Sequence, residues 1–144
     1  MAEVLIVDGH SAIFALAGLR ERHGVSGVRA RAELVGWLQA FSDVSPWHVV
    51  VVFDGRQAQR GRAGGAGEEI MVIYSKGIET ADSVIERMVA RQAGKGDRIR
   101  VASNDRMVLD TCDAFGAEGM SIRSLAEEVG RVVEAARRQW RPDS

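Results

Sequence analysis

The chain has 144 residues, of which 46% are hydrophobic and 27% are charged. This size and composition exclude a disordered chain, a collagen-like repeat and a disulfide-stabilised scaffold, and they predict one globular domain over residues 1–144. The formal net charge of −1 also argues against a protein that coats nucleic acid through a uniformly basic surface.

Apolar runs and helical periodicity alternate along the sequence. Short runs rich in Val and Ile predict strands buried on both faces, whereas apolar residues three and four apart predict amphipathic helices. Ser124 and Glu127 fit a capping box, which predicts that the last helix begins there. In chain order the expected elements are strand 4–7, helix 11–22, helix 28–41, strand 48–53, strand 70–74, helix 79–92, strand 99–102, helix 105–115 and a final helix that includes Leu125 to Ala136.

This alternation of strands and helices predicts an α/β fold with a mostly parallel sheet. Ligands of such sheets bind beyond the carboxyl ends of the strands, near the point where the strand order reverses. The residues that directly follow each strand are therefore the first candidates for a functional site.

The single cysteine and the lack of a long apolar segment narrow the class further. Cys112 lies in an apolar stretch, which favours a buried, inert thiol over a nucleophile, and a lone cysteine forms no internal disulfide. The N-terminus lacks the basic and apolar regions of a signal peptide. No segment approaches the roughly 18 apolar residues of a membrane span. We therefore expect a cytoplasmic protein with no membrane partner.

Aspartates follow the predicted strands. Asp8, Asp54 and Asp105 each come at or just after a strand end, and Asp82 lies at the start of the helix after the third strand. A single aspartate in such a position more often caps a helix or interacts with its dipole. Because the carboxyl ends of parallel strands meet at one edge of the sheet, we expect these carboxylates to converge.

Converging carboxylates indicate a metal site. Like charges repel, and a cation between them lowers the cost of keeping them ionised. Ligand sets made of oxygen alone suit Mg²⁺ or Mn²⁺ rather than zinc. Such an ion activates water and stabilises charge on a phosphoryl group, so the pattern favours hydrolysis of phosphodiesters.

The ordered segments VDG, VFDG, YSKGIETADSVIER and ASNDR, followed by GMSIRSLAEEV, resemble the YacP-like NYN-domain ribonucleases of the PIN-like nuclease superfamily. The resemblance runs from Val4 to about Val133, and its most specific part is residues 76–83 followed by residues 103–106. It implies a PIN-like three-layer α/β/α fold and RNA cleavage that depends on a divalent metal. Some members cleave mRNA in association with the ribosome, which makes mRNA and the ribosome implied partners.

The resemblance also assigns roles to individual residues. Asp8, Asp82 and Asp105 match the family's acids and are the expected ligands of Mg²⁺ or Mn²⁺. Asp54 matches the acid after the second strand and is either a further ligand or a group that orients ligands and water. Glu79 either joins them through water or caps its helix.

One family motif differs in this chain. The family usually has Asp-Gly-Tyr-Asn after the first strand, whereas this chain has Asp-Gly-His-Ser at residues 8–11. Ser11 or Asn104 is expected to supply the hydrogen-bonding group of the missing asparagine. Lys76 is either a phosphate-binding residue or a solvated loop lysine.

A glycine-rich loop, residues 55–67, begins directly after Asp54 and carries Arg56, Arg60 and Arg62. Either these arginines hold RNA phosphates beside the acids, or the loop is a flexible connector with solubilising charges. Trp37 could stack on a base, but its place beside a core stripe favours packing. The polar residues 141–144 form the tail.

The acids favour metal-dependent phosphodiester hydrolysis, and the resemblance implies that the substrate is RNA. The preferred hypothesis is therefore a metal-dependent endoribonuclease, in which an activated water attacks phosphorus, the 3′ oxygen leaves and the product has a 5′-phosphate. The alternative is a non-catalytic RNA- or ribosome-binding PIN-like module with a decayed site. A small-molecule phosphatase is a third reading, although the Asp-x-Asp pair that would favour it after the first strand is absent.

Overall fold

The computed structural model describes residues 1–16, 18–19, 21, 24, 26–55 and 70–140. The predicted loop arginines Arg56, Arg60 and Arg62 and the polar tail 141–144 lie outside the described residues. The described helices and strands are β1 (Glu3–Asp8), α1 (Gly9–Ala15), α3 (Gly27–Asp43), β2 (His48–Phe53), β3 (Met71–Tyr74), α4 (Ala81–Gly94), β4 (Arg98–Ala102), α5 (Arg106–Ala114), β5 (Glu118–Met120) and α6 (Ile122–Gln139).

The strands form one sheet in the order β3-β2-β1-β4-β5, and every neighbouring pair is parallel. This confirms the predicted α/β fold with a parallel sheet. β1 lies in the middle, so the chain first adds β2 on one side of it and later crosses to add β4 on the other. The strand order therefore reverses beside β1, where such folds bind ligands.

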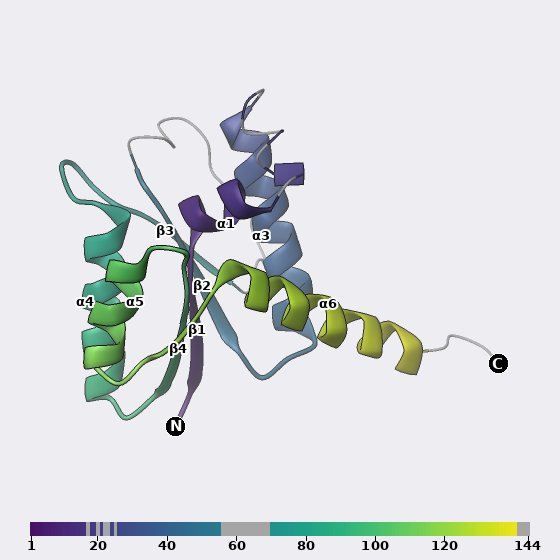
Figure 1. Ribbon diagram of the computed structural model, residues 1–144. Coiled ribbons are helices and arrows are strands. Elements are labelled where there is room, and N and C mark those ends of the chain that lie inside the picture. The colour runs from purple at the N-terminus through teal and green to yellow at the C-terminus, as the bar shows by residue number, and fades with distance from the viewer. Residues whose placement is uncertain (17, 20, 22–23, 25, 56–69, 141–144) are drawn as a thin grey trace.

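Helices cover both faces of the sheet and give three layers (Figure 1). α4 and α5 lie on one face, while α1, α3 and α6 lie on the other. Successive side chains of a strand point to opposite faces, and β1 divides accordingly. Leu5 and Val7 join the core under α1, α3 and α6, whereas Val4 and Ile6 join the core under α4 and α5.

Several element boundaries differ from those expected from the sequence. β5 was not predicted, and α1 ends at Ala15 rather than continuing to residue 22. The prediction that Ser124 caps the last helix is wrong: Ser121 is the N-cap, and its hydroxyl accepts a hydrogen bond from the Ser124 N–H at 3.1 Å. Glu79 is likewise not a helix cap, since Thr80 caps α4.

The predicted inert cysteine is confirmed. Cys112 is fully buried on α5, and burial raises the pKa of its thiol to about 11. Because the thiolate is the reactive form, a thiol with this pKa is a poor nucleophile at neutral pH. In the described part of the chain, no helix has the length and apolar character needed to cross a membrane.

Candidate functional site

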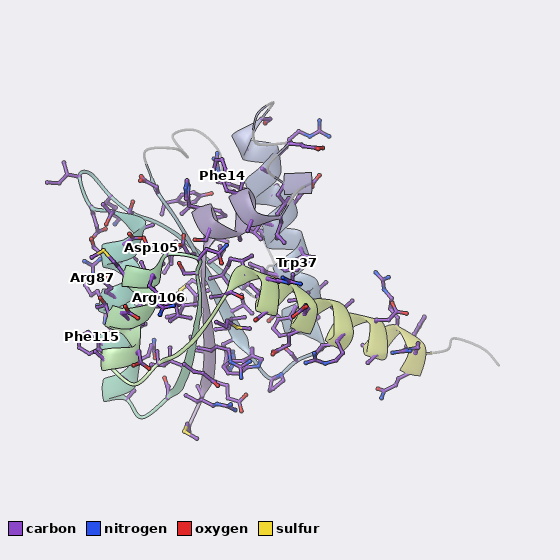
Figure 2. The ribbon with its side chains drawn as sticks, in the orientation of Figure 1. Phe14, Trp37, Arg87, Asp105, Arg106 and Phe115 are labelled. Carbon is purple, nitrogen blue, oxygen red and sulfur yellow. The ribbon has the colours of Figure 1, made fainter. Side chains whose placement is uncertain are left out.

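An acidic pocket of about 290 Å³ opens at the carboxyl end of the sheet, beside the point where the strand order reverses. The expected four aspartates all line it, so the predicted convergence is observed. Asp105 marks this end of the sheet in Figure 2, at the start of α5. The lining residues come from the ends of β1 and β2 and from the starts of α1, α4 and α5, and they are Asp8, His10, Ser11, Asp54, Thr80, Ala81, Asp82 and Asp105.

Several hydrogen bonds hold the carboxylate of Asp8 in place. This residue ends β1, is only 4% exposed and caps α1 through the Ser11 N–H, which reaches its Oδ1 at 3.4 Å. Its Oδ2 accepts two hydroxyl hydrogen bonds, from Ser11 at 2.9 Å and from Ser103 at 2.8 Å. A carboxylate oxygen has about two acceptor sites, so Oδ2 is filled and Oδ1 is the oxygen with acceptor capacity to spare.

The two serines tie the ends of β1 and β4 together. The Ser103 hydroxyl also accepts the Asp105 N–H at 3.0 Å, and the Ser11 hydroxyl accepts the Asn104 N–H at 3.1 Å. Ser103 is fully buried. This network sets the position of Asp8 relative to the loop that carries Asp105.

Asp82 has the opposite character. It lies in the first turn of α4, is half-buried, and has no hydrogen-bond or ion-pair partner among the described residues. Burial raises the pKa of its carboxyl group, and the nearby charges of Asp8 and Asp105 raise it further. A carboxylate that is partly desolvated and repelled by two others is in an environment that a cation would relieve.

Asp105 and Asp54 complete the group. Asp105 caps α5 through Oδ1, which accepts the N–H of Met107 at 2.9 Å and of Val108 at 3.4 Å. Its side chain is exposed, and Oδ2 has no partner among the described residues. Asp54 directly follows β2 and is half-buried in the pocket wall. Asp8 and Asp105 therefore have both predicted properties: each caps a helix, and each lines the acidic pocket.

Close packing at this edge of the sheet requires the glycine that follows Asp8 and the glycine that follows Asp54. A Cβ on Gly55 would meet the carbonyl oxygen of Ser75, whose hydroxyl accepts the Gly55 N–H at 3.0 Å. A Cβ on Gly9 would lie against the ring of Phe53 and 2.9 Å from the carbonyl oxygen of Val52. Glycine after each aspartate thus lets neighbouring strand ends approach and brings their carboxylates to one pocket.

The oxygen-only donor set fits a hard divalent cation such as Mg²⁺ or Mn²⁺ in kind. Within the described ranges, however, no three His, Cys, Asp or Glu side chains are grouped closely enough to hold one metal ion together. Asp8 is fixed, whereas Asp82 and the Oδ2 atom of Asp105 are unrestrained by partners among the described residues. The donor atoms are therefore of the kind that such a cation prefers, but this structure does not bring three of them together in the described residues.

Comparison with known proteins identifies the family. Residues 5–143 match the family model of the YacP-like NYN domain. The chain belongs to the YacP-like NYN family. It is 27% identical over 139 residues to the uncharacterised protein YacP of Bacillus subtilis (strain 168), a match that covers 96% of this chain and 82% of that protein.

Two crystal structures of Rae1 (YacP) from Bacillus subtilis resemble this fold. The W164L mutant is 28% identical, with a TM-score of 0.80 over 94% of this chain and 80% of that one. The other structure is 27% identical, with a TM-score of 0.80 over 94% of this chain and 78% of that one. NYN domains form a nuclease family, so the predicted resemblance is confirmed at the level of family and nuclease class.

Two other residues predicted to bind substrate lie outside the lining of the acidic pocket. Lys76 is exposed and begins a tight turn, in which its N–H donates to Glu79 Oε2 at 3.3 Å. Glu79 in turn pairs with Arg87 at 2.7 Å. Asn104 lies beside the pocket, and its Oδ1 accepts the Ile122 N–H at 3.0 Å, so its amide helps to position α6. Ser11 is the only one of these predicted residues that touches the acids directly within the described part of the chain.

Sequence reasoning overlooked Ser103. It immediately follows β4, as Asp54 follows β2, so its position at a strand end was the available signal. The direction of its hydroxyl toward Asp8 depends on the tertiary fold and could not be read from the sequence.

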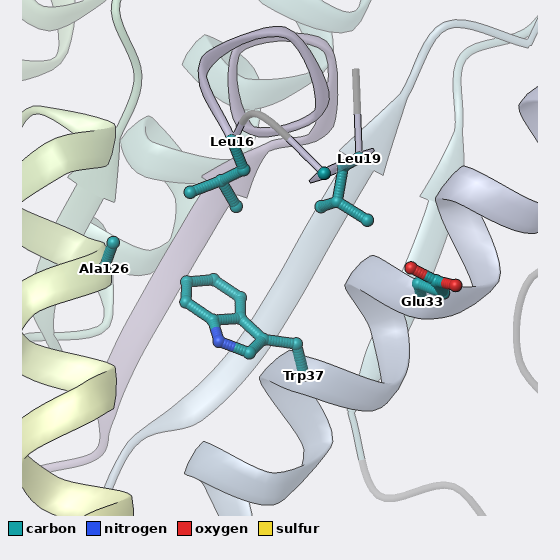
Figure 3. A pocket seen from close by; sticks show the side chains of 6 residues that line it. Leu16, Leu19, Glu33, Trp37 and Ala126 are labelled. Carbon is teal, nitrogen blue, oxygen red and sulfur yellow. The ribbon is translucent and has the colours of Figure 1, made fainter. Parts of the chain in front are cut away.

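A larger hollow of about 540 Å³ lies between α1, α3 and α6. Figure 3 shows Trp37 among the side chains that line it, with Leu16, Leu19, Glu33 and Ala126. Trp37 is half-buried and packs against the core, as the sequence predicts. This lining is mainly apolar and has a single carboxylate among the described residues, whereas four aspartates line the smaller acidic pocket.

Proposed function

We propose that the protein is a divalent-metal-dependent endoribonuclease that hydrolyses RNA phosphodiester bonds at the acidic pocket. One observation carries the proposal: Asp82 is a half-buried carboxylate without a partner in the described residues, and it lies in the field of Asp8 and Asp105. Membership of a nuclease family supports the reaction class.

In this proposal Asp8, Asp82 and Asp105 hold Mg²⁺ or Mn²⁺, and Asp54 orients ligands or water. When bound, the ion supplies positive charge that makes a water molecule more acidic and offsets the charge of the phosphodiester. No histidine base is needed for such chemistry. The chain's own contribution is a set of carboxylates at the ends of rigid elements, with one of them fixed.

Ser11 and Ser103 act as positioning residues. By donating to Oδ2 of Asp8 they leave Oδ1 as the ligand atom and prevent rotation of the carboxylate. Ser11 also stands where the family usually has asparagine, and its hydroxyl links Asp8 to the backbone of Asn104. It thereby supplies a hydrogen-bonding group at that position.

The finer assignment, mRNA cleavage in association with the ribosome, rests on the family resemblance. In the sequence, Arg56, Arg60 and Arg62 follow soon after Asp54. They support an RNA substrate, because positive charges strengthen binding of a nucleic-acid backbone. Lys76 lies on the neighbouring turn and adds a further positive charge near this end of the sheet.

A second candidate is a non-catalytic RNA- or ribosome-binding module. The lack of three grouped metal-binding side chains among the described residues favours it, as does the Asp-Gly-His-Ser motif at residues 8–11. It predicts RNA binding that survives EDTA and no cleavage with any metal.

The experiment compares labelled RNA, labelled DNA and nitrophenyl phosphate as substrates in Mg²⁺, Mn²⁺ and EDTA. The endoribonuclease predicts internal RNA cleavage with Mg²⁺ or Mn²⁺ and none with EDTA. Each arm is repeated with translating ribosomes, because a ribosome-dependent enzyme leaves naked RNA intact. Binding without cleavage in every arm supports the second candidate, and turnover of nitrophenyl phosphate alone supports a phosphatase.

A further inference from the structure

A second groove, of about 370 Å³, adjoins the acidic pocket. The two share His10, Ser11 and Asp105, so they form one continuous surface. The groove adds Phe14, Ala15 and Asn104, which contribute an aromatic ring, a methyl group and an amide. Its chemistry therefore differs from that of the acidic pocket beside it.

Phe14 is an exposed aromatic residue on α1, on the same side of the helix as the exposed His10 that also lines the groove. Ala12 and Ile13 of α1 are buried, whereas 41% of Phe14 is exposed. The His10 and Phe14 rings lie with centroids 4.6 Å apart and planes tilted by 40°. Figure 2 shows Phe14 at the same end of the sheet as Asp105. The exposed part of the Phe14 ring gives the groove an aromatic wall beside the acidic pocket.

Asn104 supplies hydrogen-bond donors to the same groove. The Ile122 N–H occupies its Oδ1 at 3.0 Å, which fixes the orientation of the amide. Its Nδ2 has no partner among the described residues, so two N–H donors stay available. An aromatic face together with amide donors is the combination that recognises an unpaired nucleobase by stacking and by hydrogen bonds to its edge.

We propose that this groove binds a nucleobase of single-stranded RNA next to the phosphodiester in the acidic pocket. The base stacks on Phe14 and accepts a hydrogen bond from Asn104 Nδ2. The inference rests on the proposed function, since it takes the acidic pocket as the place of the RNA backbone. Paired bases are already stacked within a duplex, so the groove selects single strands.

The test measures binding of labelled octauridylate and of an abasic ribose-phosphate octamer by fluorescence anisotropy, at low salt in EDTA. Phe14→Ala is expected to weaken octauridylate binding by about 5- to 100-fold, the range found when base–aromatic stacks are removed. Binding of the abasic octamer is expected to be unchanged. Phe14→Trp retains a stacking face and is expected to bind octauridylate as the wild type does.

Phe115→Ala is the matched control, because Phe115 is 48% exposed and follows α5 at the end opposite Asp105 (Figure 2). Circular dichroism confirms that each variant is folded. Equal octauridylate affinity of Phe14→Ala and wild type overturns the inference, as does equal loss of affinity for both octamers or no wild-type binding.

The failure of this inference is distinguishable from failure of the proposed reaction. If the protein cleaves RNA with Mn²⁺ but Phe14→Ala does not change octauridylate binding, the proposed reaction stands and the proposed nucleobase groove is rejected. If binding depends on the bases and on Phe14 but the protein cleaves no RNA with any metal, the proposed groove stands and the proposed reaction is rejected.

Discussion

The side chain of Ser103 has no chemistry of its own in the proposed reaction, yet it determines where Asp8 lies. Its hydroxyl donates to Asp8 Oδ2 and accepts the Asp105 N–H, so it joins two of the proposed ligands. Because Ser103 is fully buried, water cannot replace its hydroxyl at low cost. Removing it leaves a buried carboxylate with one strong donor fewer.

We expect Ser103→Ala to lower the free energy of unfolding by about 1–3 kcal/mol, the usual cost of an unsatisfied buried polar group. Urea denaturation measures this. Ser124→Ala, at an exposed position on α6, is the control and should change stability by less than about 0.5 kcal/mol. Equal stability of Ser103→Ala and wild type would show that Asp8 does not depend on this hydrogen bond.

Asp82 predicts a pH-dependent gain in stability. Its pKa is raised, first by burial and then by Asp8 and Asp105, so its ionised form destabilises the folded state at neutral pH. Asp82→Asn should therefore raise the Tm of the metal-free protein by about 1–3 °C, a modest effect because the group is half exposed to solvent.

The sign follows from linkage. Above the raised pKa the wild-type carboxylate is charged and the variant has the advantage. As the pH falls below the ordinary pKa of an aspartate, the carboxyl group is neutral in both states and the advantage disappears. Thermal melts from neutral to acid pH measure it, and an Asp82→Asn protein less stable than wild type at neutral pH would contradict the assignment.

Helices and strands are predicted correctly where a local pattern of residues favours one of them. Strand 48–53 is predicted to the residue, because its run of β-branched valines is short and favours a buried strand over a helix. β5 was not predicted, since Glu118, Gly119 and Met120 include no β-branched residue. It is a strand because β4 lies beside it, and the Ser103 N–H donates to the Met120 carbonyl at 3.1 Å.

The start of α6 could not be predicted from local sequence alone. Ser121 and Ser124 are three residues apart, and both can serve as caps. Asn104 favours the earlier start, because its side chain accepts the Ile122 N–H from another part of the chain. Such a contact is tertiary and has no local signature.

Gly55 gives a prediction for the packing of the strand ends. Gly55→Ala places a Cβ against the Ser75 carbonyl oxygen, and we expect it to lower the free energy of unfolding by about 1–3 kcal/mol, as overpacking does. Gly130→Ala is the matched control. Gly130 lies in α6 with nothing near the new Cβ, so that change should stabilise the protein by about 0.5–1 kcal/mol. Denaturant melts that show no loss for Gly55→Ala would refute the close approach.

At the scale of the whole molecule, topology made the acidic site predictable. The aspartates are far apart in sequence, but parallel strands deliver their carboxyl ends to one edge, and all four line the same pocket. The hydroxyl network, the direction of the Asn104 amide and the place of Lys76 outside the pocket lining depend on side-chain orientation. These could not be read from spacing.

The net charge of −1 also takes on a clearer meaning. It excluded a uniformly basic surface, but it concealed an uneven distribution in which aspartates gather at one sheet edge and arginines lie in the following loop segment. In the proposed reaction a metal ion offsets the charge of the first group and RNA that of the second. A nearly neutral protein is therefore compatible with a nuclease.

In the proposed reaction, Asp8 holds a metal ion that RNA cleavage needs. The most direct measurement is the rate of Mn²⁺-dependent cleavage of labelled RNA by wild type, Asp8→Asn and Asp113→Asn, the last an exposed aspartate on α5 outside the pocket lining. We predict that Asp8→Asn lowers the rate by at least about 100-fold while the protein stays folded, and that Asp113→Asn cleaves as wild type does. Undiminished cleavage by folded Asp8→Asn would contradict the claim.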